Sequence, residues 1–194
     1  MAEPKPALPV KLFIAVLYRR QEELQPLRKH LIEAFGDIDY TSPAFPFPCG
    51  GYYAEEMGEP LWRIFYSFRE LIDPSAIRVI KLRTNEIEKR MAVAGKRTVN
   101  LDPGYVDYGK VVLASMKGHN QKVYLGDGVW ADINLLYEKG KFRTLDWTFP
   151  DFREGLYDRV LLHIRAKYKA AIRGRQDSNP ADDADSSGLD SITK

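Results

Sequence analysis

The sequence contains few of the residues that form covalent cross-links or metal sites. It has one cysteine, Cys49, and three histidines in 194 residues. A single cysteine excludes an intramolecular disulfide, which fits a reducing compartment. The histidines, His30, His119 and His163, have no metal-ligand spacing to one another or to Cys49, so we predict no metal site. A chain of this length can bury a core without either kind of cross-link.

Long apolar runs and familiar phosphate-binding motifs are also missing. The apolar run at 12–17 is too short to cross a bilayer, and prolines rather than basic residues precede it, so we expect a cytoplasmic protein that makes no use of a membrane. The segment VAGKRT (93–98) superficially resembles a phosphate loop, but the required G-x-x-x-x-G-K-[ST] spacing fails at Arg90 and Arg97. No G-x-G-x-x-G follows the first predicted strand, and no serine lies in a nucleophile elbow.

Charge is distributed unevenly along a chain whose net charge is +2. The last twenty residues, 175–194, carry five aspartates against one arginine and one lysine, a net charge of −3, so the first 174 residues carry +5. This acidic tail has few large apolar side chains to bury, and we predict that it is disordered. We expect a flexible arm over 1–9 and a single domain over 10–174. The mild positive charge of that domain disfavours nucleic acid as a partner and leaves it open.

Strand-like and helix-like segments alternate in the first half of the domain. Their predicted order, β-α-β-β-α-β, matches the split β-α-β pattern of ferredoxin-like folds. The helix over 73–92 has a well-marked start, because Asp73 can cap its N-terminus and Pro74 suits its first position. The predicted strands cover 10–18, 37–47, 61–71 and 97–102, and the predicted helices cover 22–36 and 73–92.

The second half is predicted to contain a brief helix, a meander and a closing helix. We place the brief helix at 108–116, because Asp107 can cap it. The meander over 122–145 turns at GDG and at EKGK, and alternation predicts that Ile133 shares the face of Val129 and Leu135, opposite Asp132 and Asn134. The closing helix covers 150–174, with an apolar stripe of Leu156, Val160, Ile164, Tyr168 and Ile172.

The sequence therefore predicts an α+β domain: a ferredoxin-like split β-α-β core with an additional three-stranded β-meander and a C-terminal helix. The sheet is expected to be antiparallel or mixed, with its helices mainly on one face.

The segment NLDPGY (100–105) is the first of four polar segments that suggest a site. We predict a type II turn with Pro103 and Gly104 at its centre, which explains the segment in purely structural terms. In the functional interpretation, Asn100 and Asp102 share one strand face and Tyr105 follows the turn. An amide, a carboxylate and a phenol would then converge at a strand end, where ligands commonly bind in α/β sheets.

The second segment is KLRTNEIE (81–88). Lys81, Asn85 and Glu88 share one helix face, next to Thr84 at a position expected to be apolar. This face is either a helix boundary, with Thr84 bonded to the main chain, or the floor of a polar pocket to which Arg83 adds positive charge. The sequence does not decide between the two interpretations.

The third segment is the loop PFPCGGYYAEEMG (46–58), which contains Tyr53, Glu55 and Glu56. On a loop these carboxylates can bind a cation. On a short helix, adjacent glutamates point apart and make a poor pair.

The fourth segment, ASMKGHNQK (114–122), contains Lys117 and His119. Histidine suits acid–base chemistry because its unperturbed pKa is about 6.5. A single loop histidine is more often simply solvated, and a lysine near a helix end is favourable without any ligand.

Six motifs in one order resemble a bacterial family described only as a domain of unknown function, family 4416. They are YYAEEMG, SFRELIDP, IKLRTNEIE, VNLDPGY, KVVLASMKGHNQKVYLG and WTFPDF. Some members carry the label GTP-binding protein, and the resemblance implies no more than that label. The chain has neither the phosphate-loop spacing nor an N-K-x-D base-reading motif. The resemblance implies no known cofactor, reaction or catalytic residue.

Three functions follow from these segments. The first, which we favour, is binding of a small anionic or nucleotide-like ligand in a pocket where 46–58, 81–88 and 100–105 meet. The second is a metal-assisted enzyme that uses Asp102, Glu55 or Glu56, and His119. The third is a protein- or RNA-interaction module, including a homodimer, that uses the aromatic strand and the basic closing helix. The ligand-binding candidates are Lys81, Arg83, Asn85, Glu88, Asn100, Asp102, Tyr105, Lys117, His119, Tyr53, Glu55 and Glu56.

Overall fold

The computed structural model describes residues 2–47 and 52–178, which form one large antiparallel sheet with five α-helices. Seven strands of this nine-stranded sheet follow the order β2-β4-β1-β5-β6-β8-β7, while β3 pairs with β4 and β9 with β8. The strands are β1 (Val10–Tyr18), β2 (Ile38–Thr41), β3 (Phe45–Phe47), β4 (Leu61–Ile72), β5 (Val99–Val106), β6 (Lys110–Ser115), β7 (Val123–Gly126), β8 (Val129–Glu138) and β9 (Lys141–Thr144). The helices are α1 (Leu24–Phe35), α2 (Tyr52–Met57), α3 (Ile77–Met91), α4 (Pro150–Arg153) and α5 (Asp158–Ser178).

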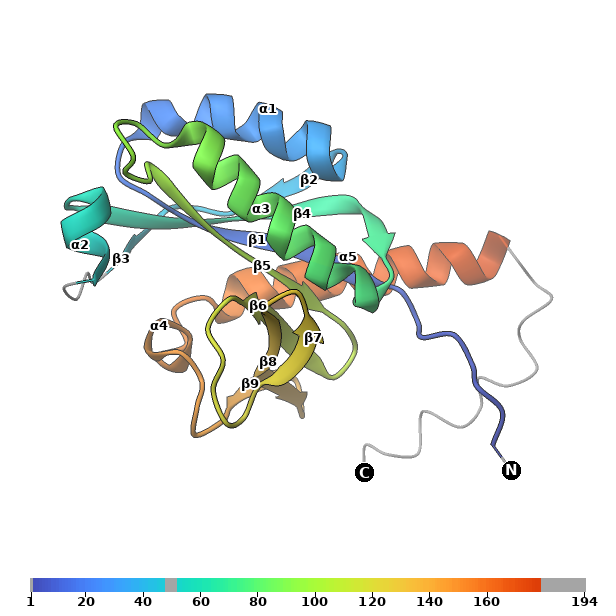
Figure 1. The fold of residues 1–194 in the computed structure, drawn as a ribbon. Coiled ribbons are helices and arrows are strands. Elements are labelled where there is room, and N and C mark those ends of the chain that lie inside the picture. The colour runs from blue at the N-terminus through green and yellow to red at the C-terminus, as the bar shows by residue number, and fades with distance from the viewer. Residues whose placement is uncertain (1, 48–51, 179–194) are drawn as a thin grey trace.

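Helices cover both faces of the sheet, with α1 and α3 on one face and α5 on the other (Figure 1). All nine residues of the central strand β1 are buried, because its side chains alternate between two cores. Leu12 and Ile14 belong to the core under α1 and α3, whereas Phe13 and Ala15 belong to the core under α5. The prediction of helices mainly on one face is therefore wrong, because α5 has its own apolar stripe and buries it on the opposite face.

The two helices predicted in the first half, over 22–36 and 73–92, are confirmed as α1 and α3. A short 3-10 turn, Gln21–Glu23, leads into α1, which ends at Gly36 with φ 83°. Another 3-10 turn leads into α3, where the Asp73 carboxylate accepts a hydrogen bond from the backbone N–H of Ser75. The apolar side chains of Ile77, Ile80 and Ile87 on α3 are buried, and so is Thr84, at the position expected to be apolar.

The brief helix predicted over 108–116 is wrong, because most of this segment is β6. The Asp107 carboxylate accepts hydrogen bonds from the backbone N–H groups of Gly109 and Lys110, 2.8 Å each, and so stabilises the hairpin turn between β5 and β6. Val111 and Val112 are β-branched and favour a strand. The segment resembles a helix in sequence because both faces of β6 are covered, which removes the polar alternation.

The predicted type II turn is also wrong, because Pro103 and Gly104 lie inside β5. Glycine is required here by close approach: a Cβ at this position would lie 2.5 Å from the carbonyl oxygen of Val112 and 2.7 Å from Phe13 Cζ. Pro103 pairs with β1 but precedes the first residue pair between β5 and β6, Gly104 with Leu113. A proline is tolerated there because no strand among the described residues needs a donor on that side.

The meander is confirmed as β7, β8 and β9, but its predicted faces are wrong beyond Ile133, because Val129 belongs to the core under α1 and α3 and Leu135 to the core under α5. Val111 pairs with Leu135 and Val112 with Ile133, so Asn134 is an extra residue in the ladder, a β-bulge. Asp132 and Asn134 are buried and Ile133 is 40% exposed. Strict alternation cannot anticipate such a bulge.

The predicted closing helix consists of two helices, α4 and α5, separated at Gly155, where φ is 72°. Leu156 lies in this break and is 43% exposed, so its predicted burial is wrong. The rest of the stripe is buried at Val160, Ile164, Tyr168 and Ile172.

The ends of the chain differ slightly from the predicted boundaries. Residues 2–9 are without helix or strand, and α5 continues to Ser178, past the expected end at 174. The remainder of the predicted acidic tail, 179–194, and the loop residues 48–51 with Cys49 lie outside the described residues. No helix in the described part of the chain is long and apolar enough to span a membrane.

Candidate functional site

Strand pairing brings together two basic segments that are far apart in the sequence. Tyr18, the last residue of β1, pairs with Val99, the first residue of β5. Because the two strands are antiparallel, the residues that follow β1 lie beside the residues that precede β5. Arg19 and Arg20 therefore come close to Lys96 and Arg97.

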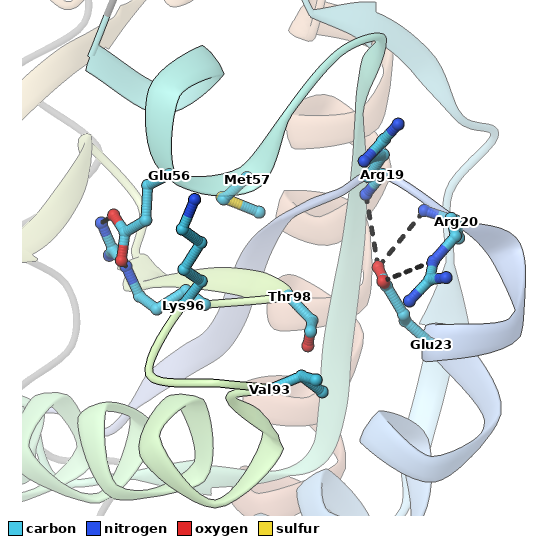
Figure 2. A pocket seen from close by; sticks show the side chains of 9 residues that line it. Arg19, Arg20, Glu23, Glu56, Met57, Val93, Lys96 and Thr98 are labelled. Atoms are coloured by element: carbon cyan, nitrogen blue, oxygen red, sulfur yellow. Dashed lines mark hydrogen bonds and ion pairs between the residues drawn. The ribbon is translucent and has the colours of Figure 1, made fainter.

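These segments and the end of α2 line a hollow of about 220 Å³, which we call the basic hollow (Figure 2). Lys96 extends from the turn before β5 toward the C-terminal end of α2, where Met57 lies (Figure 2). Met57 is buried, whereas Lys96, Arg19 and Arg20 are exposed. The lining residues are Arg19, Arg20, Glu23, Glu56, Met57, Val93, Lys96, Arg97 and Thr98.

Two of the four cations of the basic hollow are neutralised within it. Arg20 Nε lies 3.2 Å from Glu23 Oε1, and Arg97 pairs with Glu56. The side chains of Arg19 and Lys96 have no hydrogen-bond or ion-pair partner in the described part of the chain. Four cations against two carboxylates leave a charge of +2. The hollow can therefore attract an anion.

The turn that carries Lys96 is a tight two-residue hairpin. Val93 and Lys96 exchange backbone hydrogen bonds of 2.9 and 3.0 Å. Ala94 and Gly95 between them have φ values of 52° and 76°, as a type I′ turn requires. The resemblance to a phosphate loop is thus only one of sequence, but the segment still places a lysine and an arginine beside the hollow.

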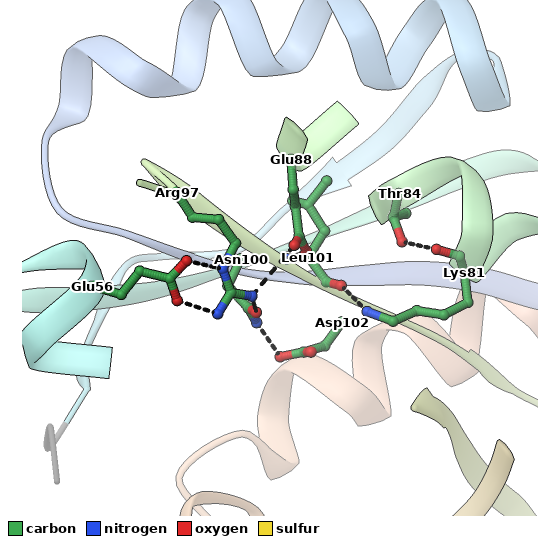
Figure 3. A network of polar contacts seen from close by, with 8 residues as sticks. All are labelled: Glu56, Lys81, Thr84, Glu88, Arg97, Asn100, Leu101 and Asp102. Carbon is green, nitrogen blue, oxygen red and sulfur yellow. Dashed lines mark hydrogen bonds and ion pairs between the residues drawn. The ribbon is translucent and has the colours of Figure 1, made fainter. Parts of the chain in front are cut away.

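A network of polar contacts behind the hollow holds Arg97 in place (Figure 3). Arg97 forms a two-pronged ion pair with Glu56, with Nε–Oε1 2.8 Å and Nη2–Oε2 2.5 Å. Its Nη1 donates to Asn100 Oδ1 at 2.7 Å and lies 3.4 Å from Glu88 Oε2. The hydrogen bond from Arg97 lowers the pKa of Glu56. One guanidinium therefore ties α2, α3 and β5 together.

Two side chains of α3 complete the open edge of β5 (Figure 3). The backbone N–H of Leu101 donates to Glu88 Oε1 at 2.6 Å, and its carbonyl accepts from Lys81 Nζ at 2.8 Å. Both α3 residues are only 6% exposed, and Thr84 donates to the carbonyl of Lys81. Burial raises the pKa of Glu88, although Lys81 and the Leu101 N–H oppose that shift. The polar face of α3 thus satisfies backbone groups where β5 lacks a neighbouring strand.

The network continues across the other face of β5 to the helix α4. Asn100 Nδ2 donates to Asp102 Oδ2 at 3.0 Å, and Arg63 Nη1 lies 3.5 Å from the same oxygen. Arg63 Nε lies 3.3 Å from Asp151 Oδ2. Burial raises the pKa of Asp151 despite this arginine, and burial also raises the pKa of Tyr157.

The three segments predicted to surround a pocket meet only in part. Glu56, Glu88, Asn100 and Asp102 belong to one network together with Lys81, and their polar atoms bond to each other or to Arg97 and Leu101. Of these five, only Glu56 also lines the basic hollow. The predicted pocket floor is therefore occupied by polar contacts, and the hollow lies beside it.

The remaining candidates lie elsewhere. Glu55 is exposed and Asn85 is half-buried, and neither forms a side-chain hydrogen bond or ion pair with another described residue. Tyr53 packs edge-on against Phe47, and Tyr105 packs against the core under α3, where burial raises its pKa. Arg83 lies over Phe35, whereas Lys117 and His119 lie in the loop between β6 and β7, where His119 contacts Gln121.

The described residues contain no cluster of metal ligands that would support a metal-assisted enzyme. Within residues 2–47 and 52–178, no three side chains of the His, Cys, Asp and Glu types are grouped so as to hold a metal ion. His119 and Glu55 also lie outside the network that contains Asp102.

Comparison with known proteins identifies the family. The family model described as Domain of unknown function (DUF4416) matches residues 8–168. The chain belongs to this family. The match extends from before β1 into α5, so the DUF4416 domain contains the whole basic hollow and the network behind it. No curated protein and no solved structure gives a significant match to the chain.

Proposed function

We propose that this DUF4416 domain binds a small anionic ligand in the basic hollow. The observation that carries the proposal is that Arg19 and Lys96 line one hollow and have no side-chain partner in the described part of the chain. Two such cations repel one another, and an anion between them converts that repulsion into attraction. The net charge of +2 within the hollow supports the same interpretation.

Arg97 shapes this site rather than contacting the ligand, because Glu56 neutralises its charge. Its bonds to Glu56, Asn100 and Glu88 engage four of the five N–H groups of a guanidinium. Arg19 and Lys96 therefore act as the direct donors to the ligand. Because these bonds already fix Arg97, this wall of the hollow requires no ordering when the ligand binds.

The expected affinity is modest. Ordering an exposed arginine or lysine side chain costs about 1.5–2 kcal/mol, whereas a hydrogen bond to a charged group contributes about 1.5–3 kcal/mol. The difference is at most about 1.5 kcal/mol for each of the two contacts, about 3 kcal/mol in all, so we expect a Kd for inorganic phosphate of about 5 mM or weaker.

Calorimetric titration of inorganic phosphate into the purified protein tests the proposal. We expect wild-type protein to bind, and Arg19→Ala and Lys96→Ala each to weaken binding about tenfold, because each removes one charge-assisted contact. Both side chains are exposed, so neither substitution should disturb folding.

Arg173→Ala is the matched control, because it removes one exposed positive charge from α5, which contributes no residue to the hollow. It should leave the Kd within about twofold of wild type, since distant surface charges are largely screened. The proposal is wrong if phosphate does not bind, or if the control weakens binding as much as Lys96→Ala does.

We also infer that residues 10–106 form a ferredoxin-like split β-α-β core. The strand order β2-β4-β1-β5 supports this inference, because β4 lies between β1 and β2, the two strands that α1 connects. In this arrangement the basic hollow lies where β1 ends and β5 begins. The strands β6 to β9 then extend the sheet beyond the core.

A further inference from the structure

Resting on the function proposed above, we infer that the ligand is a small phosphate monoester, bound as its dianion, whose organic part is about the size of a triose or pentose. This inference selects one class among anions and disfavours nucleoside diphosphates and triphosphates. It follows from the charge, the volume and the walls of the basic hollow.

The charge of the hollow matches a single phosphate group. Four cations and two carboxylates give +2, and a phosphate monoester carries about −1.5 to −2 at pH 7. A diphosphate or triphosphate would bring further negative charge next to Glu23 and Glu56, which already face the hollow. The hydrogen bond from Arg97 keeps Glu56 in its charged form, so this carboxylate repels excess negative charge.

The volume of the hollow also favours a small phosphate monoester. It is about 220 Å³, below the range of about 300–1,000 Å³ that is typical of pockets for drug-sized ligands and cofactors. A phosphate group leaves part of this space for a short carbon chain or one sugar ring. A nucleoside beside the phosphate would extend beyond the 220 Å³ of the hollow.

The walls of the hollow provide contacts for that organic part. Val93, which is 63% exposed, offers apolar surface, whereas Met57 is buried and contributes little. The hydroxyl of Thr98 donates to the carbonyl of Met91 at 3.1 Å, so its oxygen can still accept a hydrogen bond from a ligand hydroxyl. This combination suits a hydroxylated carbon skeleton.

A calorimetric panel of phosphate compounds at constant ionic strength and without divalent metal tests this inference. The panel contains inorganic phosphate, glycerol 3-phosphate, ribose 5-phosphate, ADP and GTP, with sulfate as a reference dianion. We expect at least one of the two monoesters to bind about fivefold more tightly than inorganic phosphate, ADP or GTP. Lys96→Ala should weaken binding of that monoester about tenfold, and Arg173→Ala should not.

The pH dependence provides a second readout. The second pKa of a phosphate ester is about 6, so lowering the pH from 7.5 to 5.0 should weaken monoester binding about tenfold. Sulfate remains a dianion over this range, and its affinity should change by less than about twofold. The sulfate titration thus separates protonation of the ligand from protonation of the protein.

Failure of this inference differs from failure of the proposed function. Tighter binding of ADP or GTP than of both monoesters would overturn the inference and leave an anion site in place. The same holds if sulfate loses as much affinity at pH 5.0 as the monoester does. Absence of binding by every compound in the panel would overturn the proposed function itself.

Discussion

Asp39→Ala is expected to lower the free energy of unfolding by about 3–5 kcal/mol. Asp39 lies on β2, and its Oδ2 accepts a hydrogen bond of 2.7 Å from Lys11 Nζ on β1. The side chain of Lys11 is only 1% exposed, so the substitution leaves a buried ammonium without its counter-ion. Asp39 Oδ1 also accepts from Ser67 at 2.6 Å. Urea unfolding monitored by circular dichroism measures the change.

Two further variants show that the effect arises from the unpaired charge. Lys11→Met combined with Asp39→Ala removes both charges and should recover most of the loss, because a buried ion pair is often no more stabilising than apolar side chains. Asp37→Ala is the matched control, because its carboxylate also faces a cation, Arg69, but is 70% exposed, so its loss should cost less than about 1 kcal/mol. A loss below about 1 kcal/mol for Asp39→Ala would contradict this explanation.

The contribution of Asp39, paired with Lys11, to the free energy of unfolding depends on pH with a definite sign. Burial alone would raise the pKa of Asp39, but hydrogen bonds from Lys11 and Ser67 outweigh it and lower the pKa below its ordinary value. Burial lowers the pKa of Lys11 despite the same bond, so desolvation opposes the attraction of the pair at both groups. The Asp39 contribution is present above an unfolded pKa of about 3.9 and is lost as the pH falls through the lower folded pKa.

Arg63→Ala is the second substitution with a large expected effect, also about 3–5 kcal/mol. The Arg63 side chain is 5% exposed and lies between two carboxylates, 3.5 Å from Asp102 and 3.3 Å from Asp151. Its guanidinium lies 4.9 Å from the centre of the Phe47 ring. Removing it leaves both carboxylates without this cation and opens a cavity beside the ring. Urea unfolding again measures the loss.

Controls for Arg63 separate charge from stacking. Arg63→Lys keeps the charge but loses the planar guanidinium and should cost an intermediate amount, about 1–2 kcal/mol. Arg83→Ala removes an exposed arginine that also lies over a ring, that of Phe35, and should cost less than about 1 kcal/mol. Because burial already raises the pKa of Asp151, protonation of this carboxyl at low pH should reduce the cost of Arg63→Ala. An equal cost for Arg63→Ala and Arg83→Ala would be inconsistent with a buried role for Arg63.

The sequence predicts the strands and helices where local signals and burial agree. The start of α3 follows from Asp73 and Pro74, and β1 is evident because it is apolar apart from Lys11. The errors occur where tertiary packing overrides local preference. Gly104 looks like a turn residue, yet it serves a close approach of β5 to β6, and the bulge at Asn134 inverts the expected faces of β8.

The network could be found from sequence only in part. Lys81, Thr84 and Glu88 stand out as polar residues on a helix face next to an apolar stripe, and the structure places all three at the edge of β5. The sequence gives no indication that their polar groups satisfy the backbone of Leu101 and not a ligand. That role depends on β6 pairing with only the second half of β5.

The basic hollow was missed for a different reason. Arg19 and Arg20 are separated from Lys96 and Arg97 by more than seventy residues, and each pair looks like an ordinary solvated charge pair. Only the antiparallel pairing of β1 with β5 brings them together. Two basic residues just after one strand and two just before another are the signal that, with the strand order known, would have indicated this site.

The location of bound phosphate tests the central claim most directly. In a two-dimensional ¹H–¹⁵N NMR titration with inorganic phosphate at constant ionic strength, backbone amide signals should shift and saturate for residues 19–23, 56–58 and 93–98, which surround the basic hollow. These amides should follow a single binding curve, whereas those of α5 should remain nearly unchanged. Shifts that never saturate, or that concentrate on the basic surface of α5, would contradict an anion site in the hollow.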